Sequence, residues 1–258
     1  MAKNDAGNGH VVENGDIFFL FRPMVNEAEP SGPDDVQRFY MVLRPSGGGK
    51  VRSLVVGRKH LPDVGSHERL WGFVDAIAAS GADLEKEFRE DTYETKTRGE
   101  QTQPAARPAG EGVYAVTLED GQLHLAYALE LPDEKGGGPV QRAFGIAPEA
   151  SFALSIKNPE KSQPKGAGLS GDQKADYPKR LQEEFRGRRF AREDIELLDR
   201  EGAEFILVGA RRNPEQAYDI DLDTEHENYD SAEAIRYLRM VKSRHPVEPL
   251  FQGRWTED

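Results

Sequence analysis

The sequence contains no cysteine and no long hydrophobic run. The absence of cysteine excludes disulfide bonds, thiolate metal ligands and thiol nucleophiles. Apolar runs such as Ile17–Phe21 are only five residues long, whereas a membrane-spanning helix needs roughly 18. We therefore expect a cytoplasmic protein that does not enter a membrane.

The common catalytic motifs are absent as well. The sequence has no G-x-x-x-x-G-K-[ST] phosphate loop, no G-x-G-x-x-G dinucleotide fingerprint and no H-E-x-x-H zinc motif. Gly168–Gly171 is one residue short of a nucleophile elbow. The sequence therefore does not support a P-loop NTPase, a dehydrogenase, a zinc protease or an α/β-hydrolase. The absence of these motifs favours a protein that is not an enzyme but leaves an enzyme as the alternative.

Acidic side chains outnumber basic ones by 46 to 34, which gives the 258-residue chain a formal net charge of −12. A surface of this sign disfavours nonspecific binding to nucleic acid. The 12 Phe, 8 Tyr and 2 Trp can nevertheless build a sizeable hydrophobic core. The composition therefore predicts a folded protein whose binding of anions would depend on local basic patches.

The hydrophobic pattern predicts an α+β fold, mainly antiparallel sheet with about three packed helices. Strands are expected at residues 17–22, 36–44, 51–58, 113–119, 122–131, 140–146, 152–156 and 204–208. Asp120-Gly121 is typical of a type I′ turn, so the strands on either side of it should form a hairpin. Short turns between successive strands disfavour a parallel, doubly wound sheet.

Three segments are predicted to be helical, at residues 66–77, 177–185 and 230–240. The first prediction depends on the spacing i, i+3, i+4, i+7 of Leu70, Phe73, Val74 and Ile77. Ser66 is a suitable residue to cap the first turn of that helix.

Composition also divides the chain into regions. Residues 1–14 are rich in Asn, Gly and charge and are expected to form a disordered tail. Residues 95–111 have no apolar side chain larger than Ala apart from proline, and we expect a linker or mobile loop there. This loop would separate a β-rich half, 15–94, from an α+β half, 112–258, although a single domain over 15–258 is the alternative. Both halves fit the order strand, strand, strand, helix, which allows an internal duplication.

A segment of concentrated positive charge predicts an anion site. Residues 36–60 contain six basic side chains and no acidic one. We call five of them the basic stripe: Arg38, Arg44, Arg52, Arg58 and Lys59. Positive charge on and between paired strands, with Phe39 and Tyr40 nearby, is typical of a surface that binds phosphate, nucleotides or single-stranded nucleic acid. The alternative is that these side chains form ion pairs with acidic groups elsewhere in the molecule.

A second charged segment, residues 219–230, is strongly acidic. In a strand, Asp219, Asp221 and Asp223 would share one face and could offer carboxylate oxygens to Mg²⁺ or Ca²⁺. A calcium loop that starts at Asp219 fails at Thr224, where the turn needs glycine. The alternative is an edge strand whose acidic face is solvated and deters pairing with other chains.

These segments support three hypotheses of function. The leading one is a non-catalytic binding or interaction protein that holds a phosphate-bearing small molecule, or another protein, on the basic stripe. The second is a metal-dependent phosphoester hydrolase, with Mg²⁺ or Ca²⁺ on the three aspartates and His226 or His124 moving a proton. The third is a structural subunit without a ligand.

Overall fold

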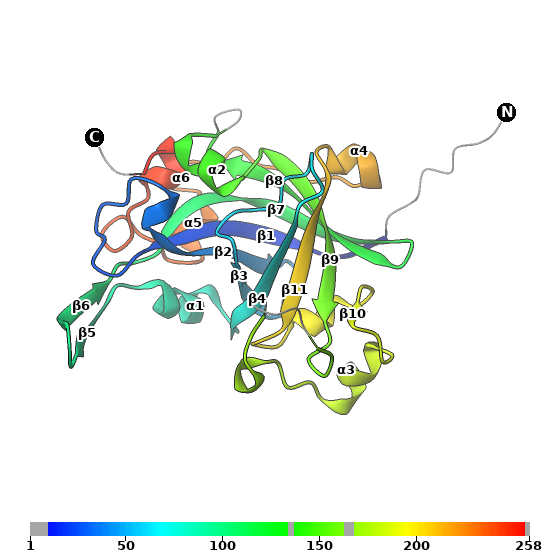
Figure 1. Cartoon of the computed structure of the whole chain (residues 1–258). Coiled ribbons are helices and arrows are strands. Elements are labelled where there is room, and N and C mark those ends of the chain that lie inside the picture. The colour runs from blue at the N-terminus through cyan, green and yellow to red at the C-terminus, as the bar shows by residue number, and fades with distance from the viewer. Residues whose placement is uncertain (1–9, 134–136, 163–167, 256–258) are drawn as a thin grey trace.

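An antiparallel sheet that closes on itself forms the body of the molecule. The computed structural model describes residues 10–133, 137–162 and 168–255. The strands follow the order β9-β11-β4-β3-β2-β1-β7-β8, and β8 also pairs with β9. All neighbouring strands are antiparallel, so eight of them form a closed barrel (Figure 1). The predicted antiparallel sheet is confirmed, and its closure into a barrel is the new feature.

The barrel strands are β1 (His10–Pro23), β2 (Val36–Pro45), β3 (Val51–Val56), β4 (Arg69–Ala78), β7 (Arg107–Glu119), β8 (Gln122–Leu131), β9 (Glu149–Lys157) and β11 (Glu204–Arg211). Strand β10 (Phe190–Ala191) pairs with β9 beyond the end of β8. Strands β5 (Asp91–Thr95) and β6 (Gly99–Gln103) form a separate two-stranded arm.

The helices are short: α1 (Gly81–Phe88), α2 (Pro139–Phe144), α3 (Lys179–Glu184), α4 (Pro214–Tyr218), α5 (Glu233–Arg236) and α6 (Glu248–Gln252). The described residues also contain the 3-10 turns η1 (Pro33–Asp35), η2 (Gly171–Gln173) and η3 (Ile195–Leu198).

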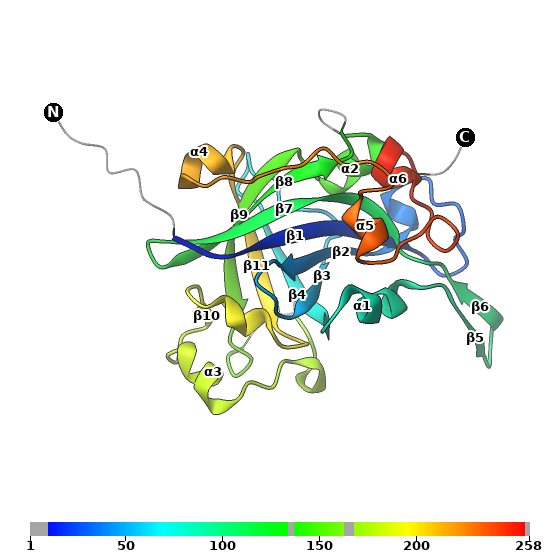
Figure 2. The ribbon, with the colours of Figure 1, turned by 180° about the vertical axis from the view of Figure 1, so that it is seen from behind.

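Alternation of side chains along the strands builds two hydrophobic layers. In β1, Ile17 and Phe19 belong to the cluster that fills the barrel, whereas Phe18 and Leu20 belong to a second cluster on the outer wall. Helices α1 and α5 and the chain from Leu238 to Leu250 cover this outer wall over β1 to β4 (Figure 2). The strand is apolar on both faces because both faces are buried.

Chain segments also close the two ends of the barrel. Helix α2 crosses one end, where the ring centroid of Phe144 lies 5.2 Å from that of Phe21 and 4.8 Å from that of Phe39. Turn η3 covers the opposite end with Leu197 and Leu198, which are both completely buried. The interior is therefore a packed core and not an open channel.

The prediction of a helix over residues 66–77 is wrong, because most of this segment is strand β4. Leu70 and Val74 face the barrel interior, while Phe73 packs against the outer layer. A strand with apolar residues on a buried face and on a half-buried one can carry apolar side chains at helical spacing by coincidence. Gly72 makes room for a ring of β11, since a Cβ there would lie 2.4 Å from Phe205.

Two further predictions of secondary structure need correction. The expected strand at 140–146 is mainly helix α2, so the second half does not have the order strand, strand, strand, helix. The expected helix over 230–240 is reduced to the single turn of α5, while the helix expected at 177–185 contains α3. The predicted Asp120-Gly121 hairpin is confirmed, with both residues at positive φ between β7 and β8.

The predicted boundaries cut through the barrel. The range 95–111 contains β6 and the buried start of β7. Residues 10–14, expected in a tail, belong to β1, whereas residues 1–9 lie outside the described part of the chain. Because β1 pairs with both β2 and β7, strands from 15–94 and 112–258 share one barrel.

A buried ion cluster lies inside the barrel at the end covered by η3. The guanidinium of Arg52, which is 3% exposed, bonds to both carboxylate oxygens of Glu13 at 2.6 and 2.8 Å. Its Nε donates to Asp199 at 2.6 Å, and the Tyr114 hydroxyl donates to Glu13 at 2.9 Å. Each charge in this cluster therefore has a partner, as burial requires.

The ion cluster predicts a large effect of a single substitution. Replacing Arg52 with Met should destabilise the protein by about 3–5 kcal/mol, because Glu13 would remain buried without its partner. Urea unfolding followed by circular dichroism measures this loss. The double variant with Glu13→Gln should recover part of the stability, and equal stabilities of Arg52→Met and the wild type would contradict the assignment.

Candidate functional site

Two arginines of the basic stripe are neutralised at the surface. Arg38 Nη1 lies 3.1 Å from the Asp75 carboxylate. Arg44 Nη1 lies 3.0 Å from Asp16 and 2.6 Å from Glu233. These contacts match the alternative that the arginines balance acidic side chains of the same molecule.

The other three members of the basic stripe do not come together to form one anion site. Arg52 is enclosed in the barrel, and Lys59 donates to the backbone carbonyl of Val36. Within the described ranges, Arg58 is exposed and has no hydrogen-bond or ion-pair partner. It lines a shallow hollow of about 470 Å³ together with Arg69. The stripe is thus a feature of the sequence that the fold distributes over several surfaces.

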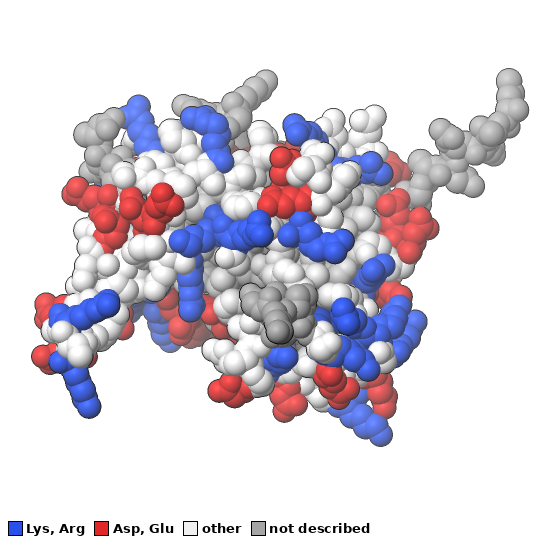
Figure 3. Space-filling view, viewed as in Figure 1, with Lys and Arg blue, Asp and Glu red and all other residues white. Residues whose placement is uncertain are grey.

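Basic side chains form a visible band across the face of the molecule in Figure 3, near the end of the barrel where α2 lies. Acidic side chains lie directly next to this band. The positive surface is therefore narrow, and an anion would need a defined pocket to avoid the surrounding acidic groups.

The acidic segment does not form the predicted strand. Asp219 ends helix α4 in the left-handed conformation, with φ of 52°, and no regular element follows up to residue 228. Asp221 and Asp223 are exposed, while Leu222 between them is buried against the outer wall. Among the described residues, no three His, Asp or Glu side chains are grouped so that they could hold a metal ion. The structure therefore does not bring the three aspartates together.

Residues 219–236, which we call the acidic strap, instead lie across the outer wall of the barrel between α4 and α5 (Figure 2). The backbone NH of Glu225 donates to Glu130 of β8 at 2.7 Å. The first two peptide groups of α5 donate to the carboxylate of Glu111 of β7 at 3.1 and 2.8 Å. Carboxyl groups of the barrel wall thus anchor the strap by its backbone.

Burial of these anchoring groups changes their protonation. Burial, together with a smaller contribution from the nearby Glu227 carboxylate, raises the pKa of Glu111 to about 8 and that of Glu130 to about 7. Burial also raises the pKa of Asp16, against which the charge of Arg44 acts. At neutral pH, much of the acidity on this wall is therefore suppressed.

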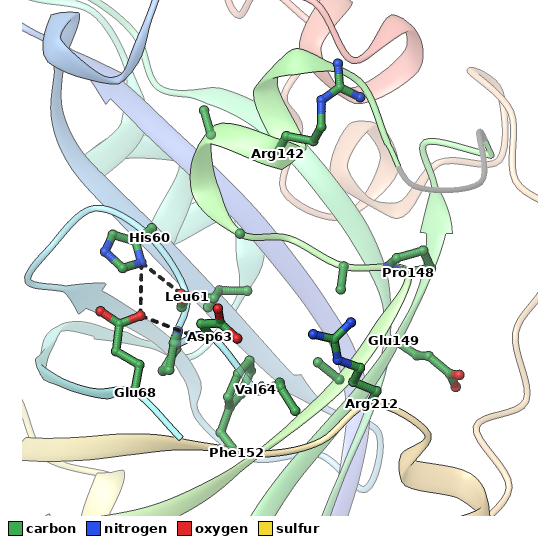
Figure 4. A pocket seen from close by; sticks show the side chains of 15 residues that line it. His60, Leu61, Asp63, Val64, Glu68, Arg142, Pro148, Glu149, Phe152 and Arg212 are labelled. Carbon is green, nitrogen blue, oxygen red and sulfur yellow. Dashed lines mark hydrogen bonds and ion pairs between the residues drawn. The ribbon is translucent and has the colours of Figure 1, made fainter. Parts of the chain in front are cut away.

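A cavity of about 890 Å³, which we call the end pocket, lies at the barrel end that α2 covers. Helix α2 and residues 145–150 form one side, and the loop 60–68 between β3 and β4 forms the other (Figure 4). The buried side chains of Ala150 and Phe152, which belong to the interior cluster, make an apolar floor. Mouths of barrels are common places for ligand sites.

Backbone contacts fix the loop that borders the end pocket. The NH of Leu61 donates to the carbonyl of Phe144 at 2.8 Å, which ties the loop to α2. On its other side the loop lies against Gly209 of β11, where a Cβ would lie 2.4 Å from the carbonyl oxygen of Asp63. The pocket is therefore formed without help from a ligand.

The acidic side chains of the end pocket either accept hydrogen bonds from backbone NH groups of this loop or point away from the cavity. Asp63 accepts a hydrogen bond from the NH of Gly65 at 2.6 Å. Glu68 accepts from the NH of Asp63 at 3.0 Å and lies 3.9 Å from Nδ1 of His60. Glu149 points away from the cavity in Figure 4.

The two arginines of the end pocket are less engaged. Arg212, directly after β11, extends toward the cavity, and Arg142 of α2 lies at the opposite rim (Figure 4). Arg142 donates to the carbonyl of Gly137 at 2.8 Å. Arg212 has no hydrogen-bond or ion-pair partner in the described part of the chain. A guanidinium offers forked donors that match the oxygens of a carboxylate or phosphate.

The sequence analysis did not find the end pocket. Its groups come from loop 60–68, from α2 and from Arg212, which are distant in the sequence. They meet because β3 and β11 end, and β4 and β9 begin, at the same edge of the barrel. The acid-free window 36–60 reaches the edge of the pocket at His60, but its charge alone does not locate the cavity.

Comparisons with known proteins add no further guide. No family model, no curated protein and no solved structure matches this chain. Within residues 10–133, 137–162 and 168–255, no helix has the length and hydrophobicity needed to cross a membrane. The assignment of a site therefore depends on the geometry of the end pocket.

The acidic strap gives a prediction about pH. An unfolded Glu has a pKa near 4.5, and that of Glu111 in the folded state is about 8. Between these values Glu111 holds more protons in the folded state, so its contribution to the free energy of unfolding should decrease as the pH rises from about 5 to about 8. Glu111→Gln should reduce this decrease by up to roughly 1 kcal/mol per pH unit, measured by urea unfolding at several pH values.

The matched control for this measurement is Glu100→Gln on the exposed β5–β6 arm. It should leave the pH dependence of stability unchanged. If Glu111→Gln shows the same slope as this control, the raised pKa of Glu111 does not contribute to stability.

Proposed function

We propose that this protein is a non-catalytic binding protein that holds a small organic anion in the end pocket. The observation that carries this proposal is the position of Arg212, which extends into the cavity without a partner among the described residues. The proposal keeps the anion-binding function predicted from the sequence but moves it from the basic stripe to the barrel end.

The pocket also indicates the class of ligand. Its volume of about 890 Å³ fits a small molecule, and Phe152 and Ala150 at its floor favour an apolar body. Arg212 and Arg142 favour a carboxylate or phosphate group at the opposite end of the molecule. An amphipathic organic acid satisfies both requirements better than a bare inorganic ion does.

The hydrolase hypothesis receives no comparable support. The three aspartates are not grouped around a metal position, and His226 and His124 do not line the end pocket. His124 instead bonds to the hydroxyl of Tyr218 at 3.0 Å beneath α4, where burial lowers its pKa. A binding function needs none of these groups.

The test is isothermal titration with benzoate, octanoate and adenosine monophosphate. We expect at least one of them to bind the wild type. Arg212→Gln should weaken that binding by about tenfold, since a charged hydrogen bond is lost from the site. Arg142→Gln should have a smaller effect of about threefold, because Arg142 lies at the rim and already bonds to Gly137.

The matched control is Arg98→Gln on the β5–β6 arm, which removes the same charge far from the pocket. It should bind the ligand as the wild type does. Binding by none of the three anions, or equal affinities of Arg212→Gln and Arg98→Gln, would contradict the proposal and favour a structural role.

A further inference from the structure

Arg107 also has an unsatisfied donor and, unlike Arg58 and Arg212, it is buried. Arg107 opens strand β7 and is only 5% exposed. Its guanidinium donates to the carbonyl oxygens of Trp255 and Ala28. Its Nε atom is buried without a hydrogen-bond partner, and no carboxylate lies within ion-pair distance in the described part of the chain.

This arrangement is costly for the protein on its own. A buried charge normally has an opposite charge in contact with it, as Arg52 has in Glu13. Around Arg107, the carboxylates of Glu248, Glu27 and Glu29 act only from longer range, and burial lowers the pKa of the guanidinium. Two carbonyl groups and distant carboxylates neutralise the Arg107 charge only in part, so a bound anion in contact with the guanidinium would stabilise it further.

Arg107 lines a cavity of about 520 Å³, which we call the arm pocket. Its lining comes from the loop after β1, from the base of the β5–β6 arm and from the segment 242–246. Figures 1 and 2 show where the β5–β6 arm leaves the body of the molecule. Lys242 and Arg244 bring two more positive charges to its lining, and each also has an acidic partner, Glu248 at 3.2 Å and Glu85 at 3.3 Å.

The remaining lining of the arm pocket is suited to an oxyanion. It includes the polar side chains of Asn26, Thr102 and Ser243. Glu90 is the acidic residue in the lining, and it is exposed. Of the three cationic side chains in the lining, Lys242 and Arg244 are already paired with carboxylates, so Arg107 is the one that lacks a carboxylate in contact with it among the described residues.

We propose that the arm pocket is a second binding site, specific for an oxyanion, in which the Arg107 guanidinium binds a phosphate or carboxylate group. Lys242 and Arg244 supply additional positive charge at the rim. The site is separate from the end pocket, so it does not depend on the function proposed there.

The experiment measures the thermal midpoint in sodium phosphate and in sodium acetate, each against sodium chloride at equal ionic strength. We expect phosphate, acetate or both to raise the midpoint of the wild type. Arg107→Lys keeps the charge but loses the forked donors, and it should weaken the apparent affinity by about tenfold or more. Lys242→Gln, at an exposed position, should weaken it by about threefold.

Two controls separate the sites. Arg98→Lys on the arm should respond as the wild type does, and Arg212→Gln in the end pocket should keep the response. A response to phosphate alone indicates a phosphate ester as the natural ligand, and a response to acetate indicates a carboxylate; either supports the site.

Three results would overturn the proposal: no response to either anion, an unchanged response in Arg107→Lys, or loss of the response in Arg212→Gln instead. If Arg107→Lys does not fold, Lys242→Gln decides, and an unchanged response in that variant overturns the site.

Discussion

The pairing of β8 with β9 is the contact on which the rest of the structure depends. It joins the two ends of the eight-strand sheet over six residue pairs, from Leu123 opposite Leu154 to Ala128 opposite Glu149. Closure removes the open edges of the sheet and encloses one face of every strand. The enclosed face needs segments to cover the barrel ends, which α2 and η3 provide, and the outer face needs α1, α4 and α5. Both pockets lie along the margins of these covering segments, because the cover is incomplete there.

Closure of the barrel also determines which arginines lack a carboxylate partner and can bind an added anion. Inside the barrel a guanidinium must be neutralised, and Arg52 is neutralised by Glu13 and Asp199. On the outer wall, Arg44 pairs with Asp16 of β1 and with Glu233 of the acidic strap. Arg212 and Arg107 lie at the barrel end under α2, where the strands stop and only loops approach them. The positions without carboxylate partners are therefore set by topology, and local charge density in the sequence does not identify them.

The sequence was a good guide to strands and a poor guide to sites, for related reasons. The Asp120-Gly121 turn and the alternation of side chains along β8 and β9 depend on residues close together in the sequence. They can therefore be predicted without knowledge of distant contacts. The helix prediction for 66–77 was wrong because apolar residues stand on both faces of β4, which hides from the sequence the two-residue period that separates a strand from a helix. The surroundings of the stripe and of the acidic run could not be predicted locally, because the partners of Arg52 and the anchors of the strap are far away in the chain. Closure of the barrel is likewise a long-range property, since nothing near β8 specifies that β9 completes the ring.

The net charge of −12 constrains how such a protein can bind an anion. Long-range attraction, which brings anionic partners to strongly basic proteins, is not available here, because the average field repels them. Affinity must come from short-range forked hydrogen bonds and from apolar contact within a pocket, both of which act inside the screening distance of roughly 8 Å at physiological salt. Added salt would weaken both the repulsion between the acidic surface and the anion and the attraction between the anion and the arginine in the pocket. The affinity should therefore vary much less steeply with salt than that of a protein that binds nucleic acid through many phosphate contacts. A small ligand suits these conditions better than a polyanion does, because every further negative charge would lie outside the pocket and against an acidic surface.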